Sequence, residues 1–127
     1  MEIRDQLEEL YEALLAEPEL EGVLIKSYTR PEELDETEPS IILIPIGPPM
    51  QSNAGSDIYL TKKFMYQVNV ESIDRKEAKG LQAVVERVLL EKGFHQMSGG
   101  LDEWIPDIKR YADARTYSGR GVLYENY

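Results

Sequence analysis

The feature that most constrains the fold of this chain is a long run of alternating apolar and polar residues near its middle. The apolar positions share one parity, and Lys62 is the single break among them: Ile58, Leu60, Phe64, Tyr66, Val68 and Val70. Their neighbours are mostly polar. Because successive side chains of a β-strand point to opposite faces of a sheet, this pattern predicts one long strand with a buried face and a wet face.

Helical spacing of apolar residues predicts one helix before this strand in the sequence and one after it. The first stripe ends before Pro18, since proline disfavours helical geometry at the preceding residue; it consists of Ile3, Leu7, Leu10, Tyr11, Leu14 and Leu15. The second helix starts at Asp74, whose side chain can cap backbone N–H groups, and stops at Gly93. Gly80 inside it is expected to permit a close approach to the sheet. Its stripe consists of Ala78, Leu81, Val85, Val88 and Leu89.

Shorter apolar runs predict the remaining strands, the last two separated or bulged at 118–121: 23–28, 40–46, 94–97, 111–117 and 122–124. Residues 102–107 are expected to be irregular. Two segments, 29–39 and 48–57, are expected to be mobile loops because they are turn-forming and lack periodicity. The order is helix, three strands, helix, then two or three strands. It predicts a single α+β domain over 1–127, with a largely antiparallel sheet and two helices packed on one face.

Composition excludes several kinds of site. The chain has 127 residues, no cysteine and one histidine, His95. Disulfides, thiolate zinc sites, a cysteine nucleophile and a multi-histidine metal site are therefore ruled out within one chain. The longest apolar run, 41–46, is too short to span a bilayer, and the acidic N-terminus does not resemble a secretory signal. We expect no membrane association and a soluble protein in the compartment where it is made.

The negative charge is concentrated at one end. The net charge is −10, and residues 1–40 hold thirteen acids against three bases, whereas 41–127 hold eleven of each. An acidic surface repels phosphate, which argues against nucleic-acid binding by that part of the chain. It suits either a basic protein partner or simply a solvated helix face with a solubilising loop.

No motif names a reaction. The glycines near 98–100 and 119–121 lack the spacing of a phosphate-binding loop and are interpreted as turns. Asp102, Glu103, Asp107 and Asp113 lie close together in sequence, and with His95 they suggest a small metal-dependent hydrolase as an alternative. They match no ligand motif. We therefore predict no enzyme activity, no cofactor and no metal.

Tyrosine and arginine alternate near the C-terminus, a composition typical of protein interfaces. The alternative is that these residues form a half-buried sheet face. Together with three residues of the 48–57 segment they make up the predicted interface: Met50, Gln51, Asn53, Tyr111, Arg115, Tyr117, Arg120 and Tyr124.

The order of several blocks resembles a known class of virion proteins. The blocks are Ile41–Ile46, a non-periodic loop, Tyr59–Val70, a helix ending in Leu90–Phe94, then Gly100–Asp102 and Arg115–Arg120. Over residues 20–125 they look like small tail-completion proteins of siphophages and prophages of Gram-positive bacteria. Some of these are known only as domains of unknown function, and they are similar to tail terminators. The acidic N-terminal helix has no counterpart in this resemblance.

The resemblance implies a non-enzymatic virion component, made in the host bacterial cytoplasm. Tail terminators are α+β proteins that assemble as hexameric rings on the end of the tail tube, stop its growth and contact the head connector. The implied partners are therefore tail-tube and head-connector proteins and further copies of the chain itself, with no specific nucleic-acid binding. A monomer in solution that closes into a ring only on the tube is compatible with this. An acidic adaptor that binds a basic protein is the other alternative.

Overall fold

The computed structural model describes residues 3–28, 38–55 and 58–122. Two α-helices, one short 3₁₀-helix and seven strands are present in this part of the chain. In chain order they are α1 (Gln6–Leu15), η1 (Pro18–Leu20), β1 (Leu24–Ser27), β2 (Ser40–Pro45), β3 (Met50–Gly55), β4 (Ile58–Ser72), α2 (Arg75–Glu91), β5 (His95–Gln96), β6 (Leu101–Ile105) and β7 (Arg110–Val122). The α+β class and the order of elements are as predicted.

β4 is the central strand of a single seven-stranded sheet. β7 pairs with it antiparallel from Thr61–Val122 to Ser72–Tyr111. On the other side of β4, β2 pairs with its second half and β3 with its first half, both antiparallel. β1 extends the sheet by pairing parallel to β2, and β5 and β6 both pair with the far edge of β7. The alternating pattern that opened the sequence analysis therefore marks the strand around which the sheet is built.

Both helices cover the same face of the sheet. α1 packs on β1 and β2, α2 packs on β4, β5 and β7, and the helices contact each other. The core lies between the helices and one parity of each strand, and its members include Leu10, Leu14, Ile41, Leu43, Phe64, Tyr66, Val68, Val70, Val85, Leu89, Phe94 and Tyr117. We call the opposite face, which no described helix covers, the open face.

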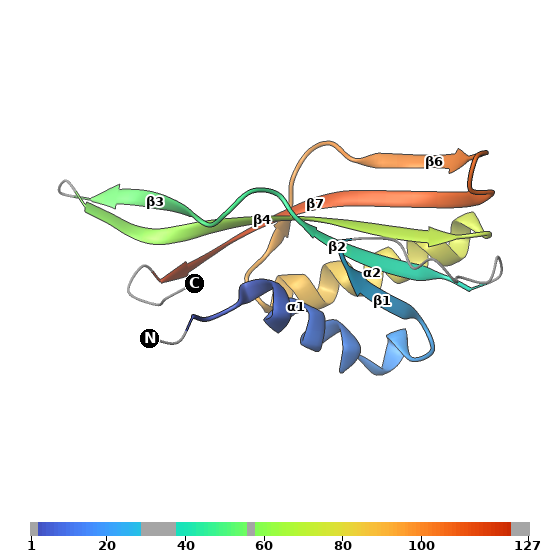
Figure 1. Cartoon of the computed structure of the whole chain (residues 1–127), viewed down its shortest axis with the longest axis horizontal. Coiled ribbons are helices and arrows are strands. Elements are labelled where there is room, and N and C mark those ends of the chain that lie inside the picture. The colour runs from blue at the N-terminus through green and yellow to red at the C-terminus, as the bar shows by residue number, and fades with distance from the viewer. Residues whose placement is uncertain (1–2, 29–37, 56–57, 123–127) are drawn as a thin grey trace.

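β3 and the first part of β4 project beyond both helices (Figure 1). We call this projection, Met50–Gly55 with Ile58–Lys63, the arm. The prediction of a mobile loop over 48–57 is wrong for residues 50–55, which form β3. Polar residues form this strand because its backbone groups pair with β4, and that pairing requires no apolar alternation. The other predicted loop falls at 29–37 outside the described residues.

Two more strand predictions are wrong. Residues 101–105 form β6, although we expected most of them to be irregular, and β7 is continuous across 118–121, where we expected a break. The glycine that suggested the break has a packing role. A Cβ on Gly119 would lie 2.6–2.8 Å from ring atoms of Phe94, so glycine is required for this ring to reach the core.

The helix ends are set by capping side chains. The carboxylate of Asp5 accepts a hydrogen bond from the backbone N–H of Glu8, so α1 begins at Gln6 and excludes Ile3. Ile3 and Leu15 are mostly exposed, which corrects their place in the predicted stripe. Asp74 caps α2 as predicted, through the N–H of Lys76. The expectation for Gly80 is wrong, because it is exposed and no atom lies within 4 Å of a Cβ built there.

Candidate protein interface

Strand register brings two of the predicted interface residues together on the open face. Met50 of β3 is the partner of Lys63 in β4, and Lys63 is the partner of Arg120 in β7. Residues paired across antiparallel strands point to the same face. Phe64 is buried among the helices, so its neighbour Lys63 and the whole row point away from them. Met50 and Arg120 are thus held on either side of Lys63.

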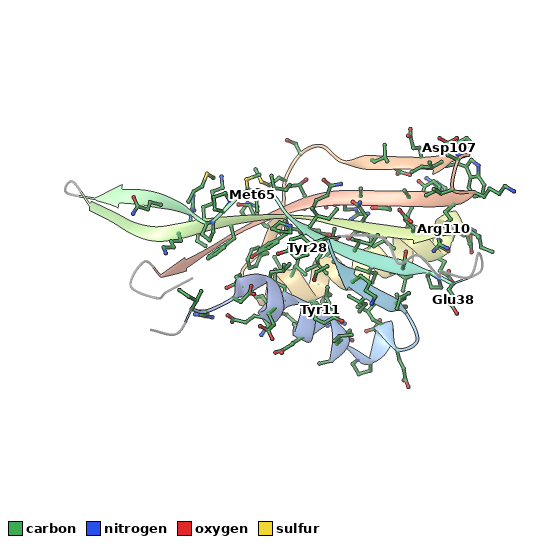
Figure 2. All side chains as sticks on the ribbon, in the orientation of Figure 1. Tyr11, Tyr28, Glu38, Met65, Asp107 and Arg110 are labelled. Atoms are coloured by element: carbon green, nitrogen blue, oxygen red, sulfur yellow. The ribbon has the colours of Figure 1, made fainter. Side chains whose placement is uncertain are left out.

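A second row lies next to the first. His95 of β5 is paired with Ser118, and Ser118 is paired with Met65 of β4. Figure 2 labels Met65 on β4 near the point where the arm leaves the body of the molecule. We call these two rows, Met50, Lys63, Met65, His95, Ser118 and Arg120, the open-face patch.

The patch is basic. A hollow of about 340 Å³ lies over it, and Lys63, His95 and Arg120 are among the residues that line it. No acidic side chain does so among the described residues, and in this part of the chain no carboxylate pairs with Lys63 or Arg120. In a chain of net charge −10, this leaves a local excess of positive charge.

A groove of about 530 Å³ lies on the helical side of the sheet at the same end of the molecule. Phe64 and Tyr66 contribute to its apolar wall, and Ile3 and Tyr28 stand at it with more than 60% of their surface exposed. Asp5, Glu8 and Arg4 also line it, and the guanidinium of Arg4 is bound to the carboxylate of Glu9. The groove is therefore apolar inside and acidic where α1 begins. We call it the α1 groove.

Part of the acidity of the first forty residues is neutralised within the molecule. Arg4 forms a two-pronged contact with the carboxylate of Glu9, at 2.7 and 2.9 Å, and this bond lowers the pKa of Glu9. Arg87 on α2 lies 2.8 Å from Glu17 and 3.2 Å from Glu19. Glu8 and Glu12 on the exposed side of α1 have no such basic partner among the described residues. Glu8 and Glu12 therefore leave α1 with an acidic exposed side.

The tyrosines of the predicted interface belong to the core instead. Tyr111 is 6% exposed and Tyr117 is fully buried. Tyr117 donates a hydrogen bond of 3.0 Å to Gln82 of α2, and burial raises its pKa, which keeps the hydroxyl protonated. The chain as described therefore offers neither ring to a partner. The predicted alternative was a half-buried sheet face; these two residues lie on the core-facing side of the sheet and are more deeply buried than that.

The other predicted interface residues are distributed more widely. Arg115 lies on the helical side of β7, where it contacts Asp113 at 3.0 Å and Glu86 at 3.5 Å. Gln51 is exposed at the base of the arm and is paired with Lys62. Asn53 lies in β3, and Tyr124 lies outside the described residues. Of the predicted residues whose side chains the structure describes, only Met50 and Arg120 meet in one place on the open face.

The residues considered for a metal-dependent hydrolase are not arranged as a ligand set. Asp102 binds the ammonium group of Lys79, which lowers the pKa of the carboxyl group. Asp107 lies at the β6–β7 turn (Figure 2), and His95 is on β5. No group of three metal-ligating side chains occurs among the described residues. Asp102 and Asp113 are paired across β6 and β7, but Lys79 bridges them, at 3.5 Å from Asp113.

Sequence reasoning missed Lys63, His95 and the α1 groove as members of an interaction surface. The alternating pattern marks Lys63 only as a polar neighbour, and His95 entered the sequence analysis only as a candidate of the hydrolase alternative. Their meeting depends on the pairing of β4, β5 and β7, which are distant in sequence. Within the described residues, no helix is both long and apolar enough to cross a membrane.

The fold is similar to that of a virion protein. No protein-family model matches the chain, and no curated protein matches it in sequence. Among solved structures, a chain in the virion of a native gene transfer agent (GTA) particle superimposes with a TM-score of 0.62 at 16% sequence identity. The match covers 87% of this chain and 90% of that chain. The likeness therefore extends over nearly the whole of both proteins, and at this identity it is a likeness of fold.

Proposed function

We propose that this chain is a non-enzymatic structural protein of a phage, prophage or phage-like particle, of the tail terminator or neck type. In this role it assembles as a ring that caps the tail tube and joins it to the head. The observation that carries the proposal is the shared fold with a chain of the GTA virion over nearly the full length of both proteins. The resemblance of the sequence blocks to tail-completion proteins points the same way.

The surfaces of the molecule support a role in assembly. The open-face patch and the α1 groove adjoin at Met65, and the charged residues that they present are of opposite sign. The arm extends beyond the helices, where it can reach a partner (Figure 1). A ring closes by heterologous contacts, in which one surface of each subunit meets a different surface of the next. The remaining partners would be tail-tube and head-connector proteins, and the protein would be a virion component made in the host bacterial cytoplasm.

The test is assembly in solution and on tubes. We expect light scattering from micromolar to near-millimolar protein, at two salt concentrations, to show monomers that climb towards a closed ring. With tubes assembled from a cognate tail-tube protein, negative-stain electron microscopy should show the chain at tube ends. Its addition during polymerisation should shorten the tubes. A protein that stays monomeric and leaves both tube ends and tube length unchanged would contradict the proposal.

Metal addition distinguishes the hydrolase alternative. A structural protein of this kind should show no change in melting temperature with Mg²⁺ or Mn²⁺. A metal-induced rise that is abolished in the double variant Asp102→Ala with Asp107→Ala would instead favour the hydrolase. The matched control is Glu12→Ala with Glu21→Ala, which removes two exposed acids elsewhere.

A further inference from the structure

The open-face patch and the α1 groove have complementary chemistry. The patch presents Lys63 and Arg120 beside Met50, whose side chain is 48% exposed. The groove presents Ile3 and Tyr28 beside the carboxylates of Asp5 and Glu8, and Glu12 follows one turn later on the exposed side of α1. Each surface thus combines an exposed apolar side chain with a charge, and the two charges are opposite. Opposite charges on two surfaces guide their association and fix the orientation in which they dock.

The two surfaces are also placed as a ring requires. Lys63 and Arg120 of the patch lie on the open face of β4, and the groove carboxylates lie at the start of α1 on the helical side, both at the end where the arm begins. The two surfaces meet at Met65, which belongs to the patch and also lines the groove. A copy whose Lys63 and Arg120 are docked therefore keeps Glu8 and Glu12 free for the next copy. Contacts of this heterologous kind close into a ring when the rotation between subunits permits it.

A polyanion is a less suitable occupant of the patch. Double-stranded DNA would meet Lys63 and Arg120 favourably, but the whole chain has a net charge of −10, which repels phosphate. The acidic side of α1 belongs to the same molecule and is present at the same concentration as the patch. The occupant that the charges favour is therefore a second copy of this chain.

We propose that the open-face patch of one copy docks on the α1 groove of the next. Lys63 and Arg120 face Glu8 and Glu12 of the neighbour, and Met50 contacts the apolar wall of the groove beside Ile3 and Tyr28. This contact is a step beyond the ring of the proposed function and rests on it. It also gives a role to the acidic N-terminal helix.

Charge reversal tests the contact. One variant carries Lys63→Glu and Arg120→Glu, and a second carries Glu8→Lys and Glu12→Lys. Each variant alone places like charges opposite each other, so we expect its self-association to weaken about tenfold or more. An equimolar mixture restores opposite charges at every contact, so it should associate as the wild type does. Recovery in the mixture also shows that both variants are folded.

The matched control is Lys26→Glu with Lys76→Glu. It makes the same change in net charge as Lys63→Glu with Arg120→Glu, but at two exposed residues that line neither the patch nor the groove. This control should associate like the wild type. Reversed variants that associate as well as the control, or a mixture that stays dissociated, would overturn the proposal.

Disulfide trapping tests the contact when association is weak. The chain has no cysteine, so Met50→Cys on one copy and Gln6→Cys on another introduce a single reactive pair. Under mild oxidation we expect the mixed dimer to exceed both homodimers. In the control pair, Met50→Cys with Lys76→Cys, the second cysteine lies on α2 and does not line the groove. This pair should form a disulfide only at the background level. Equal trapping of the two pairs would overturn the contact.

The outcomes separate this inference from the proposed function. Rings that form without trapping or charge dependence would leave the function standing and remove the contact. An absence of rings, of tube-end binding and of trapping would remove both. If Lys63→Glu with Arg120→Glu left association unchanged but abolished binding to double-stranded DNA, the patch would be a nucleic-acid surface and the contact would be overturned.

Discussion

At the scale of single residues, the buried amide of Gln82 connects α2 to the two longest strands. Its nitrogen donates to the carbonyl oxygens of Val68 in β4, at 3.1 Å, and Asp113 in β7, at 2.9 Å. Its oxygen accepts the hydroxyl hydrogen of Tyr117. The Gln82 side chain is fully buried. A polar residue within the apolar stripe of a helix is therefore accommodated because every group has a partner.

We expect Gln82→Met to lower the free energy of unfolding by about 2–4 kcal/mol, because the Tyr117 hydroxyl and two carbonyls lose a partner while the volume changes little. Urea denaturation measures this. The control is Gln67→Met on the open face, where the side chain is only half-buried and bonds to Asn69. A loss for Gln82→Met no larger than that of the control would show that the buried bonds contribute nothing.

We predict opposite effects on stability when alanine replaces two of the glycines. Gly119→Ala places a Cβ within 2.8 Å of the Phe94 ring and should cost about 1–3 kcal/mol through overpacking. Gly80→Ala in the exposed face of α2 meets no atom within 4 Å and should stabilise the protein by up to about 1 kcal/mol. Melting temperatures of the two variants should therefore move in opposite directions. A rise for both would mean that the Phe94 ring shifts freely.

At the scale of elements, a buried arginine fastens one end of the sheet. Arg110 begins β7 and donates to the carbonyl oxygens of Glu38, just before β2, and of Glu71 in β4, the latter at 2.9 Å. Its guanidinium also lies 3.8 Å from the buried Glu71 carboxylate. Figure 2 shows Arg110 and Glu38 at the same end of the sheet. One side chain thus links three segments.

Arg110→Met removes the positive charge beside buried Glu71, and we expect a loss of about 3–5 kcal/mol in the free energy of unfolding. The matched control is Arg120→Met on the same strand, an exposed site where the change should stay within about 0.5 kcal/mol. Chemical denaturation of both variants checks this. Equal losses would show that burial of the Arg110 pair does not matter for stability.

Helices and strands whose apolar residues recur at regular spacing could be predicted from the sequence. Strands that form because a neighbouring strand supplies backbone partners could not. α2 and β4 show their burial in the spacing of apolar residues, and the structure agrees with both to within a few residues. β3 and β6 are short, polar or exposed, and they exist because a long neighbouring strand supplies backbone partners. β7 is continuous because β4 pairs with it across 118–121, and the glycine at 119 leaves room for the ring of Phe94, which lies far from it in sequence.

The candidate site was predictable only in part, for the same reason. Met50 and Arg120 were chosen from composition, but their position on either side of Lys63 follows from the register of three strands. The tyrosines of β7 have interface-like chemistry in the sequence. Tyr111 and Tyr117 share one parity of the predicted strand 111–117, but the sequence alone did not show that this parity faces the core.

At the scale of the whole molecule, the arm adds no residue to the described core of the rest of the protein, which we call the body. The described core residues all lie outside 46–63, and the arm projects past both helices. Gln51 and Lys62 are paired at the base of the arm, so a two-residue Asn-Gly turn can replace residues 52–61. The body retains its helices, its core and most of its sheet.

We expect this shortened protein to unfold cooperatively, with a melting temperature within a few degrees of the full chain, and to lose binding to tube ends. Calorimetry and electron microscopy with tubes measure the two properties. Loss of folding would show that the arm is part of the cooperative unit. Retained tube-end binding would show that another surface makes that contact.

The long antiparallel ladder between β4 and β7 has a mechanical consequence. Its inter-strand bonds run perpendicular to the strands, from Thr61–Val122 at one end to Ser72–Tyr111 at the other. A tension applied along the strand axis loads this ladder in shear, so its bonds must stretch together and cannot peel apart one after another. A molecule built in this way resists pulling along its strands better than pulling across them.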